Sequence, residues 1–424
     1  MLDIRFIREN QEAVRNALKE RGSDLDLDPF FALDEKRRAI IKELDELRAK
    51  QNKINDEISV LIKAKQDPKP KIAETKAMSA RSGELESDFK SVKEAFDAIL
   101  LNIPNIPHAS IPRGDISRNK LVRSWKEPKK FAFKPSNHVD ICEDLDIVDL
   151  KRASKITGSN FILFKKQGAL LERALLNFML DLHTEKHGYT EVFPPFLVNR
   201  ASMTGTGQLP KLEEDMYRLK DDDLFLIPTA EVPVTNIHRD EILGEDQLPV
   251  YYTAYTACFR REAGSYGKDT RGLMRVHQFD KVELVKFVHP SSSYDELEKL
   301  VVCAEEVLQL LDIPYRVLLL ATGDISFAAA KCYDLEAYAP GIDKWLEVSS
   351  CSNFEDFQAR RANIRFKDKQ TGKNNFVHTL NGSGIALART VIAIIENYQN
   401  ADGSVTIPEV LRKYMHGKDK ISRE

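Results

Sequence analysis

The sequence has few cysteines, few tryptophans and no long apolar run. Its five cysteines are scattered through 424 residues, without a C-x-x-C pair or the Cys/His spacing of a zinc site. We therefore expect reduced thiols and no zinc. No apolar run approaches the roughly 18 residues that span a bilayer, and the N-terminal residues are too charged for a secretory signal. These absences predict a soluble, cytoplasmic protein with no membrane partner.

Two common nucleotide-binding motifs are also missing. The chain contains neither a G-x-G-x-x-G sequence nor a Walker A loop, and its strands and helices do not alternate regularly. These features argue against a Rossmann or P-loop domain. Charge is close to balance, with 63 Lys and Arg against 66 Asp and Glu, so composition neither favours nor excludes a nucleic-acid partner.

A long heptad pattern occupies the N-terminal third. Apolar residues recur every seventh position on both sides of Asp67-Pro68-Lys69-Pro70, and this predicts an antiparallel two-helix coiled coil over about 29–100. The two series are Leu33, Ile40, Leu47, Ile54 and Leu61, then Met78, Leu85, Val92 and Ile99.

Such a coiled coil could serve as a spacer or a dimerisation element. The tip, however, is basic, with lysines that outnumber Asp67 and Glu74, and a basic tip could contact a phosphate backbone. The lysines are Lys63, Lys65, Lys69, Lys71 and Lys76. We expect an N-terminal domain over 1–105, a proline-rich linker over 106–119 and a catalytic domain over 120–424.

The remaining chain predicts an α+β domain in which helices flank an antiparallel sheet. Helices are expected near 165–187 and 293–312, and strands near 250–262, 273–288, 315–320, 332–338 and 345–350. Pro194 and Pro195 interrupt another strand, which we therefore place at a sheet edge or a subunit interface. The C-terminal residues HGKDKISRE are expected to be disordered.

The segment 259–285 predicts a strand–loop–strand hairpin with unusual charge. Strand alternation places Arg260 and Glu262 on one face, and Arg275, His277, Phe279, Lys281 and Glu283 on one face of the returning strand. The connecting loop carries Gly264, Gly267, Gly272, Lys268 and Arg271, and such a loop can approach a polyanion closely. The alternative is a surface hairpin with cross-strand ion pairs.

The segment 379–399 predicts a glycine-rich turn, Asn381-Gly382-Ser383-Gly384, that caps an apolar helix. Arg389 falls on the apolar face of that helix, so its guanidinium needs an anionic partner. That partner is either a carboxylate, such as Glu396, or a phosphate.

These segments resemble the bacterial seryl-tRNA synthetases along essentially the whole chain. The resemblance covers the first 20 residues, the heptad arm, both segments above, and three further motifs. They are GTGQLPKLEEDMY at 205–217, PTAEVP at 228–233 and EVSSCSNFEDFQARR at 347–361. The resemblance implies a class II synthetase fold and a dimer interface around Pro194–Pro195. Ala328, Cys332 and Tyr338 depart from the family's usual residues, without removing an expected ligand.

The resemblance also implies roles for individual residues. Arg260, Arg275 and Arg389 would be the catalytic arginines that hold the phosphates of ATP. The serine-binding residues would be Thr229, Ala230, Glu231, Glu283, Asn381 and Ser383. The ATP-binding residues would be Arg260, Arg261, Glu262, Arg275, Val276, Phe279, Glu347, Val348, Ser349, Ser350 and Arg389. Glu347 and Ser350 would bind Mg²⁺.

The implied activity is ligation of L-serine to tRNA(Ser), and also to tRNA(Sec), by a homodimer that uses ATP and Mg²⁺. The basic arm would reach the long variable arm of the tRNA. Two alternatives stay open at this point. One is an inactive paralogue that binds tRNA or protein as a regulator, and the other is a ligase that charges a carrier protein.

Overall fold

The computed structural model describes residues 1–263 and 272–423, which fall into two compact units. One unit is Asp3–Pro104, and the other is Asn105–Glu424 together with Met1–Leu2. Most of the basic loop predicted from the sequence lies outside the described residues, namely Gly264, Gly267, Lys268 and Arg271.

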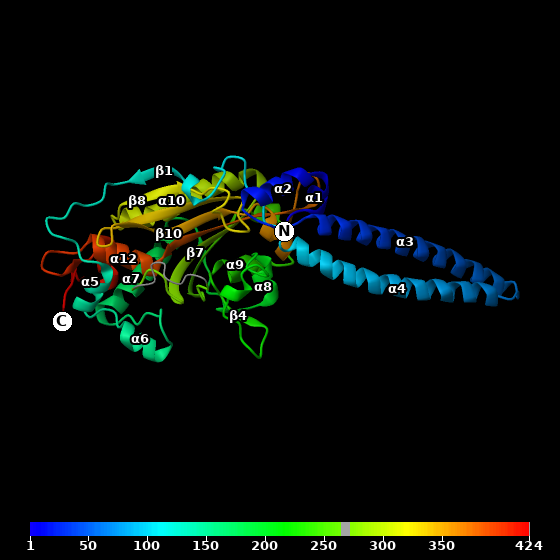
Figure 1. Cartoon of the computed structure of the whole chain (residues 1–424), viewed down its shortest axis with the longest axis horizontal. Coiled ribbons are helices and arrows are strands. Elements are labelled where there is room, and N and C mark those ends of the chain that lie inside the picture. The colour runs from blue at the N-terminus through cyan, green and yellow to red at the C-terminus, as the bar shows by residue number, and fades with distance from the viewer. Residues whose placement is uncertain (264–271, 424) are drawn as a thin grey trace. The chain divides into compact units, whose positions relative to one another are not determined.

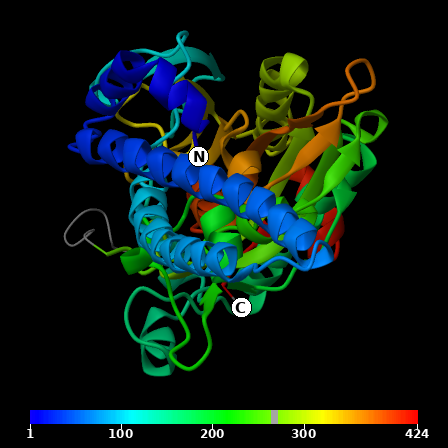
Figure 2. The ribbon, with the colours of Figure 1, turned by 90° about the vertical axis from the view of Figure 1, so that its right-hand side faces the viewer.

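The smaller unit contains the helices α1 (Ile4–Glu9), α2 (Gln11–Glu20), α3 (Asp28–Lys63) and α4 (Lys69–Leu100). The long helices α3 and α4 run side by side in opposite directions (Figure 1, Figure 2). Their heptad residues meet in a buried cluster of Ile40, Leu44, Leu85 and Val92, against which Leu33, Leu47 and Phe89 pack. The predicted antiparallel coiled coil is therefore confirmed.

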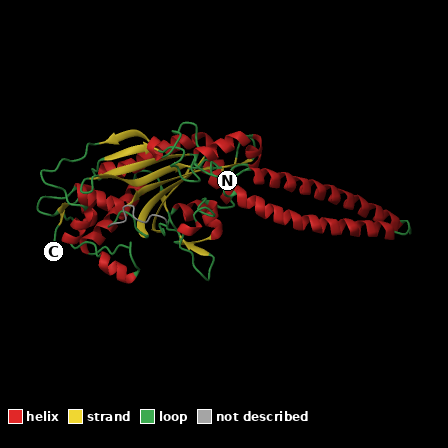
Figure 3. Ribbon diagram, viewed as in Figure 1, coloured by secondary structure: helices red, strands yellow, loops and turns green. Residues whose placement is uncertain are grey.

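The larger unit is built on one eight-stranded sheet in the order β1-β8-β9-β10-β13-β7-β6-β2. Figure 3 shows the strands in yellow and the helices in red. All neighbours are antiparallel except β2 and β6. The predicted α+β fold is confirmed. The strands are β1 (Lys120–Trp125), β8 (Tyr315–Leu319), β9 (Lys331–Ala339), β10 (Lys344–Asn353), β13 (His378–Ala386), β7 (Gln278–Val288), β6 (Val250–Phe259) and β2 (Thr190–Glu191).

The longer helices of this unit pack directly on the sheet. Helix α10 (Ser293–Leu310) packs against β13 and β10, α12 (Leu387–Asn397) against β9, β10 and β7, and α7 (Lys166–Glu185) against β6. Their apolar residues and those of the central strands form the core, because a sheet buries its apolar face against helices. No helix in the described part of the chain is long and apolar enough to cross a membrane.

The remaining elements are short. The helices are α5 (His138–Asp144), α6 (Leu150–Ile156), α8 (Arg200–Gly205), α9 (Glu231–Thr235), α11 (Phe357–Ala362) and α13 (Glu409–Arg412). The strands are β3 (Leu197–Asn199), β4 (Leu224–Leu226), β5 (Ile242–Gly244), β11 (Arg365–Lys367), β12 (Asn374–Phe376), β14 (Val405–Thr406) and β15 (Lys420–Ile421).

The glycine-rich segment before the last helix is not a turn, contrary to the prediction. Asn381 to Gly384 lie inside β13, and α12 begins only at Leu387 without a side-chain cap. The glycines are needed for close packing: a Cβ at Gly382 would lie 2.8 Å from Cys351 Sγ, and one at Gly384 would lie 2.8 Å from His183 Nε2. A bulge with Ile385 at φ 124° interrupts the pairing of β13 with β7.

The hairpin strands are shorter than predicted. Strand β6 ends at Phe259 and β7 begins at Gln278, so Arg260, Glu262 and Arg275 lie beyond the regular strands. Simple alternation therefore does not set their direction, and Glu262 instead has a left-handed backbone with φ 51°.

The prediction of a disordered C-terminus is also wrong. Lys420–Ile421 form β15, which pairs with β14, and the Ile421 side chain is buried. One buried isoleucine in a short strand carries too little periodicity to be recognised from sequence.

Candidate active site

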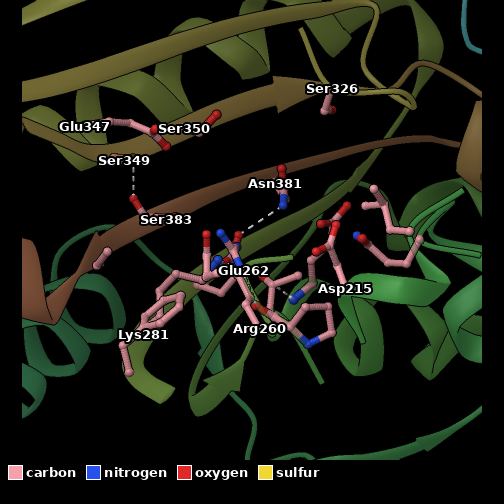
Figure 4. A pocket seen from close by; sticks show the side chains of 18 of the residues that line it. Asp215, Arg260, Glu262, Lys281, Ser326, Glu347, Ser349, Ser350, Asn381 and Ser383 are labelled. Carbon is pink, nitrogen blue, oxygen red and sulfur yellow. Dashed lines mark hydrogen bonds and ion pairs between the residues drawn. The ribbon is translucent and has the colours of Figure 1, made fainter. Parts of the chain in front are cut away.

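A cavity of about 720 Å³ opens in the larger unit, where the ends of β6 and β7 face β10, β13 and α12. Figure 4 shows Glu347 and Ser350 on one strand, with Arg260 and Lys281 beyond Asn381 and Ser383. Charged groups of both signs therefore converge on one cavity, which is typical of a site for a polar, charged ligand.

A buried polar cluster forms one part of the cavity wall. Glu283 is only 1% exposed and accepts hydrogen bonds from Asn381 Nδ2 at 3.1 Å and Thr229 Oγ1 at 3.1 Å. Lys281 Nζ lies 2.5 Å from the Glu283 carboxylate and donates to Thr229 Oγ1 at 2.8 Å. A buried carboxylate with this many partners is fixed in place, so it can select a cation by position.

Glu231 is a second buried carboxyl group in the same wall. It accepts a hydrogen bond from Gln358 Nε2 at 2.6 Å, and Gln358 in turn accepts one from Thr379 Oγ1 at 2.7 Å. Burial, and then the nearby charge of Glu283, raise the pKa of Glu231 to about 7. This carboxyl group therefore changes charge near neutral pH.

Another part of the wall carries arginines and an aromatic ring. The Arg260 guanidinium lies 5.3 Å from the centre of the Phe279 ring, and its Nε donates to Pro228 O at 3.3 Å. Arg275 forms an ion pair of 2.5 Å with Glu262. An aromatic face beside two guanidinium groups offers stacking and charge to a nucleotide.

Arg389 reaches the cavity from α12. It donates to Met274 O at 3.2 Å and to Glu347 O at 2.7 Å, and it lies 3.5 Å from the Glu347 carboxylate. Its guanidinium is half-buried rather than enclosed in the core. Glu396, the carboxylate partner considered from the sequence, instead binds His138 and the Gly341 backbone, so that pairing is wrong.

The two residues expected to bind Mg²⁺ suit a site in which the substrate supplies part of the metal's ligands, rather than a site built from protein ligands alone. Within the described residues, no three His, Cys, Asp or Glu side chains gather as a metal site. Glu347 and Ser350 both line the cavity, and the Glu347 side chain is 50% exposed. Mg²⁺ commonly uses one or two carboxylates and completes its shell with water and substrate phosphates. The donor set therefore suits a metal held together with a polyphosphate.

Most residues predicted for the site line this one cavity, although they come from segments far apart in the chain. Ala230 and Arg261 do not line it: Ala230 packs in an apolar cluster, and the Arg261 backbone binds Asp215 O. Ser349 lines it and donates to Ser383 O at 2.6 Å. The residues named from the sequence that line the cavity are Thr229, Glu231, Arg260, Glu262, Arg275, Val276, Phe279, Glu283, Glu347, Val348, Ser349, Ser350, Asn381, Ser383 and Arg389.

Sequence reasoning missed other wall residues, among them Asp215, Ser326, Phe354 and the segment 206–208. Asp215 and 206–208 lie in the motif at 205–217, so that motif was the available signal. Of the three departures from the family pattern, Ala328 lines the cavity, and Cys332 Sγ lies 3.1 Å from Ser350 Oγ.

Comparison with known proteins identifies the family. A model of the seryl-tRNA synthetase N-terminal domain matches residues 1–107, and a model of the tRNA synthetase class II core domain (G, H, P, S and T) matches residues 214–398. The serine–tRNA ligase of Trichlorobacter lovleyi is 58% identical over 424 residues and covers 100% of both chains. This chain belongs to the seryl-tRNA synthetase family. The serine–tRNA ligase of Carboxydothermus hydrogenoformans is 57% identical over 425 residues, again with 100% of both chains covered.

Solved structures of the family agree with this fold. The seryl-tRNA synthetase of Pyrococcus horikoshii complexed with ATP has a TM-score of 0.93 at 41% identity, with 100% of both chains covered. The cytoplasmic serine–tRNA ligase of Naegleria fowleri in complex with AMP has a TM-score of 0.88 at 30% identity, covering 100% of this chain and 99% of that chain.

Proposed function

We propose that this chain is a serine–tRNA ligase, which activates L-serine with ATP and transfers it to the 3′ end of tRNA(Ser). The observation that carries the proposal is one cavity in which Arg260, Arg275 and Arg389 converge with the buried Glu283 cluster. Serine and ATP together carry the complementary groups: one ammonium group for the carboxylate cluster and several anionic groups for the arginines. The ATP and AMP complexes of the two solved relatives support a nucleotide in the cavity.

In this proposal, Glu283 and Glu231 attract the serine ammonium group, while Asn381, Ser383 and Thr229 surround its small side chain. A site that hydrogen-bonds the serine hydroxyl discriminates strongly against alanine, which lacks that hydroxyl. Threonine must be excluded by the size of the pocket.

ATP occupies the arginine side. Phe279 stacks on the adenine, Glu262 faces its amino group, and the Val276 backbone contacts the base. Arg260 holds the α-phosphate together with the serine carboxylate, and Arg275 and Arg389 hold the outer phosphates. Glu347 and Ser350 would bind Mg²⁺, which supplies charge neutralisation on the polyphosphate when it is bound.

The first step is an in-line displacement. A serine carboxylate oxygen forms a bond to the α-phosphorus while the bond to pyrophosphate breaks, and pyrophosphate leaves with that electron pair. A terminal ribose hydroxyl of the tRNA then attacks the serine carbonyl carbon, and AMP leaves. Both nucleophiles belong to substrates, so the protein contributes positioned cations and orientation.

The N-terminal unit is proposed to bind the tRNA, and Asn105–Glu424 to carry the catalysis. The tip lysines Lys63, Lys65 and Lys69 are exposed and suit a phosphate backbone. Such contacts read backbone and shape rather than base sequence. As membership of the family implies, we expect tRNA(Sec) to be a second substrate wherever it occurs. Aminoacylation of a tRNA(Sec) transcript tests this directly.

A homodimer through the β2 edge is a further part of the proposal. Phe193, which precedes the two prolines, is 74% exposed beside this edge strand. Sedimentation should give about twice the chain mass of 48.3 kDa, and a monomer at micromolar concentration would contradict it. We propose that the protein is located in the cytoplasm, because translation there uses the charged tRNA.

The deciding experiment is amino-acid-dependent ATP–pyrophosphate exchange without tRNA, tested with serine, threonine, alanine, glycine and cysteine. Strong exchange with serine alone is expected. No exchange with any of them, from folded protein, would overturn the proposal and favour the inactive paralogue. Charging of a carrier protein instead of tRNA(Ser) after normal exchange would favour the third alternative.

A further inference from the structure

We propose that Asp215 is a positioning residue that sets the selectivity of this site for the base of ATP. It would do so by fixing the backbone on both sides of Glu262, and the inference rests on the proposed contact of Glu262 with the adenine amino group. Asp215 ends a short 3-10 helix, η2 (Glu213–Asp215), and lines the cavity. Figure 4 shows it on the same side of the cavity as Arg260 and Glu262.

Asp215 accepts two hydrogen bonds, one from each residue that flanks Glu262. The Arg261 backbone N–H donates to Asp215 O at 3.0 Å, and the Ala263 N–H donates to Asp215 Oδ1 at 2.9 Å. Glu262 lies between these two donors. Its neighbours on both sides are thus tied to one residue about 47 positions earlier in the chain.

Glu262 needs such support because its backbone conformation is unusual. Its φ is 51°, in the left-handed region that few residues other than glycine adopt. This conformation turns the carboxylate toward the cavity, where it reaches Arg275 at 2.5 Å. Loss of the Ala263 bond would let the segment relax to a right-handed or extended conformation, which would aim the carboxylate elsewhere.

The preceding residue is already fixed by other contacts. Arg260 N donates to His277 O at 2.9 Å, and His277 Nδ1 lies 3.0 Å from Arg260 O, which it must reach as a donor. The guanidinium of Arg260, which serves the α-phosphate, therefore does not depend on the Asp215 side chain. A change at Asp215 should affect recognition of the base without disturbing the contact of Arg260 with the α-phosphate.

The test compares two nucleotides that differ at one group. Serine-dependent pyrophosphate exchange is measured with ATP and with purine riboside triphosphate, which lacks the 6-amino group. The wild type, Asp215→Ala, Asp215→Asn and the neighbouring control Glu214→Ala are compared. Glu214 is an exposed acid of the same short helix. Thermal midpoints and the KM for serine report on folding and on the rest of the site.

Asp215→Ala should raise the KM for ATP about tenfold, the usual effect of one lost hydrogen bond to a charged group. Its kcat and its KM for purine riboside triphosphate should stay within about twofold, so the preference for ATP collapses. Asp215→Asn keeps an acceptor oxygen and should stay within about threefold of wild type. Glu214→Ala should match wild type.

A double-mutant cycle with Glu262→Ala tests whether Asp215 acts through Glu262. In that background, Asp215→Ala should cause no further loss of ATP preference, since coupled residues are not additive. Equal losses on both nucleotides, or additive losses in the cycle, would overturn the inference, as would Asp215→Asn behaving like Asp215→Ala. Absence of serine-dependent exchange in the wild type would instead refute the proposed function itself.

Discussion

Glu231 shows how burial gives one carboxyl group a functional pH range. Its pKa is raised to about 7 because the group is buried and lies near the charge of Glu283. If the ionised form attracts the serine ammonium group, binding should weaken as Glu231 gains its proton. The KM for serine in pyrophosphate exchange should therefore rise as pH falls below about 7.

Glu231→Gln should make that profile flat, since glutamine keeps the shape without titrating. The same substitution should affect stability with a defined sign. A pKa raised on folding contributes stability below the ordinary pKa of Glu, and this contribution is lost as pH rises through about 7. Glu231→Gln should thus stabilise the fold at pH 8 by about 1–3 kcal/mol relative to pH 5. An unchanged KM profile in the variant would contradict the assignment.

The sequence pointed to single residues that line the cavity where charge and family motif coincided. Arg260, Arg275 and Arg389 were recognised from arginines among apolar or alternating residues, and all three line the cavity. The sequence left the partner of Arg389 open, because Glu396 lies about two helical turns further along the same helix and looked equally suitable. In the structure, Glu396 instead contacts His138, which lies 258 positions away in the chain.

At the scale of elements, two helical glycines have opposite surroundings. A Cβ at Gly168 in α7 would lie 2.3 Å from Ile147 O, whereas a Cβ at Gly83 in α4 would meet nothing within 4 Å. Gly83→Ala should stabilise α4 by about 0.5–1 kcal/mol, because alanine restricts the unfolded chain. Gly168→Ala should instead destabilise the larger unit by about 2 kcal/mol or more, because backbone must move.

Thermal unfolding of the full chain, followed by circular dichroism, separates the two variants. Gly83→Ala should leave the unfolding midpoint unchanged or raise it. Gly168→Ala should lower the midpoint by several degrees, since 1 kcal/mol corresponds to about 2–4 °C for a domain of this size. A harmless Gly168→Ala would mean that α7 can shift away from Ile147 without cost.

The elements with long periodic patterns were predicted well, and those with short patterns were not. Seven-residue spacing over α3 and α4 repeats many times, so the coiled coil was determined by local sequence alone. Strand β13 was mistaken for a turn because glycines usually mark turns. Here the glycines are needed because Cys351 and His183 pack closely against the strand. These neighbours come from another strand and a helix, so the local sequence does not show them.

At the scale of the whole molecule, the proposed division of labour separates tRNA binding from adenylation. Replacing the exposed tip lysines Lys63, Lys65 and Lys69 together by glutamate should weaken binding of tRNA(Ser) at least tenfold. It should also make the dependence of affinity on salt shallower by roughly one unit per lost phosphate contact. Pyrophosphate exchange with serine and ATP should be unchanged.

Lys36→Glu is a control within the coiled coil, because Lys36 is an exposed lysine of α3 far from the tip. It should affect tRNA binding little. Equal effects of the tip and control substitutions would indicate general electrostatic attraction rather than a contact at the tip. Filter binding or fluorescence titration at two salt concentrations provides the measurement.

The sequence by itself determined the coiled coil, the class of fold and the reaction expected from long ordered motifs. Repeated spacing and motifs involve residues that are close together in the chain, so they can be recognised without knowing the fold. Tertiary structure alone decided which side chains meet: Asp215 with the backbone around Glu262, Gln358 with Glu231, and His138 with Glu396. These contacts join residues 48, 127 and 258 positions apart, and such pairings depend on how the strands and helices pack, which no local pattern encodes.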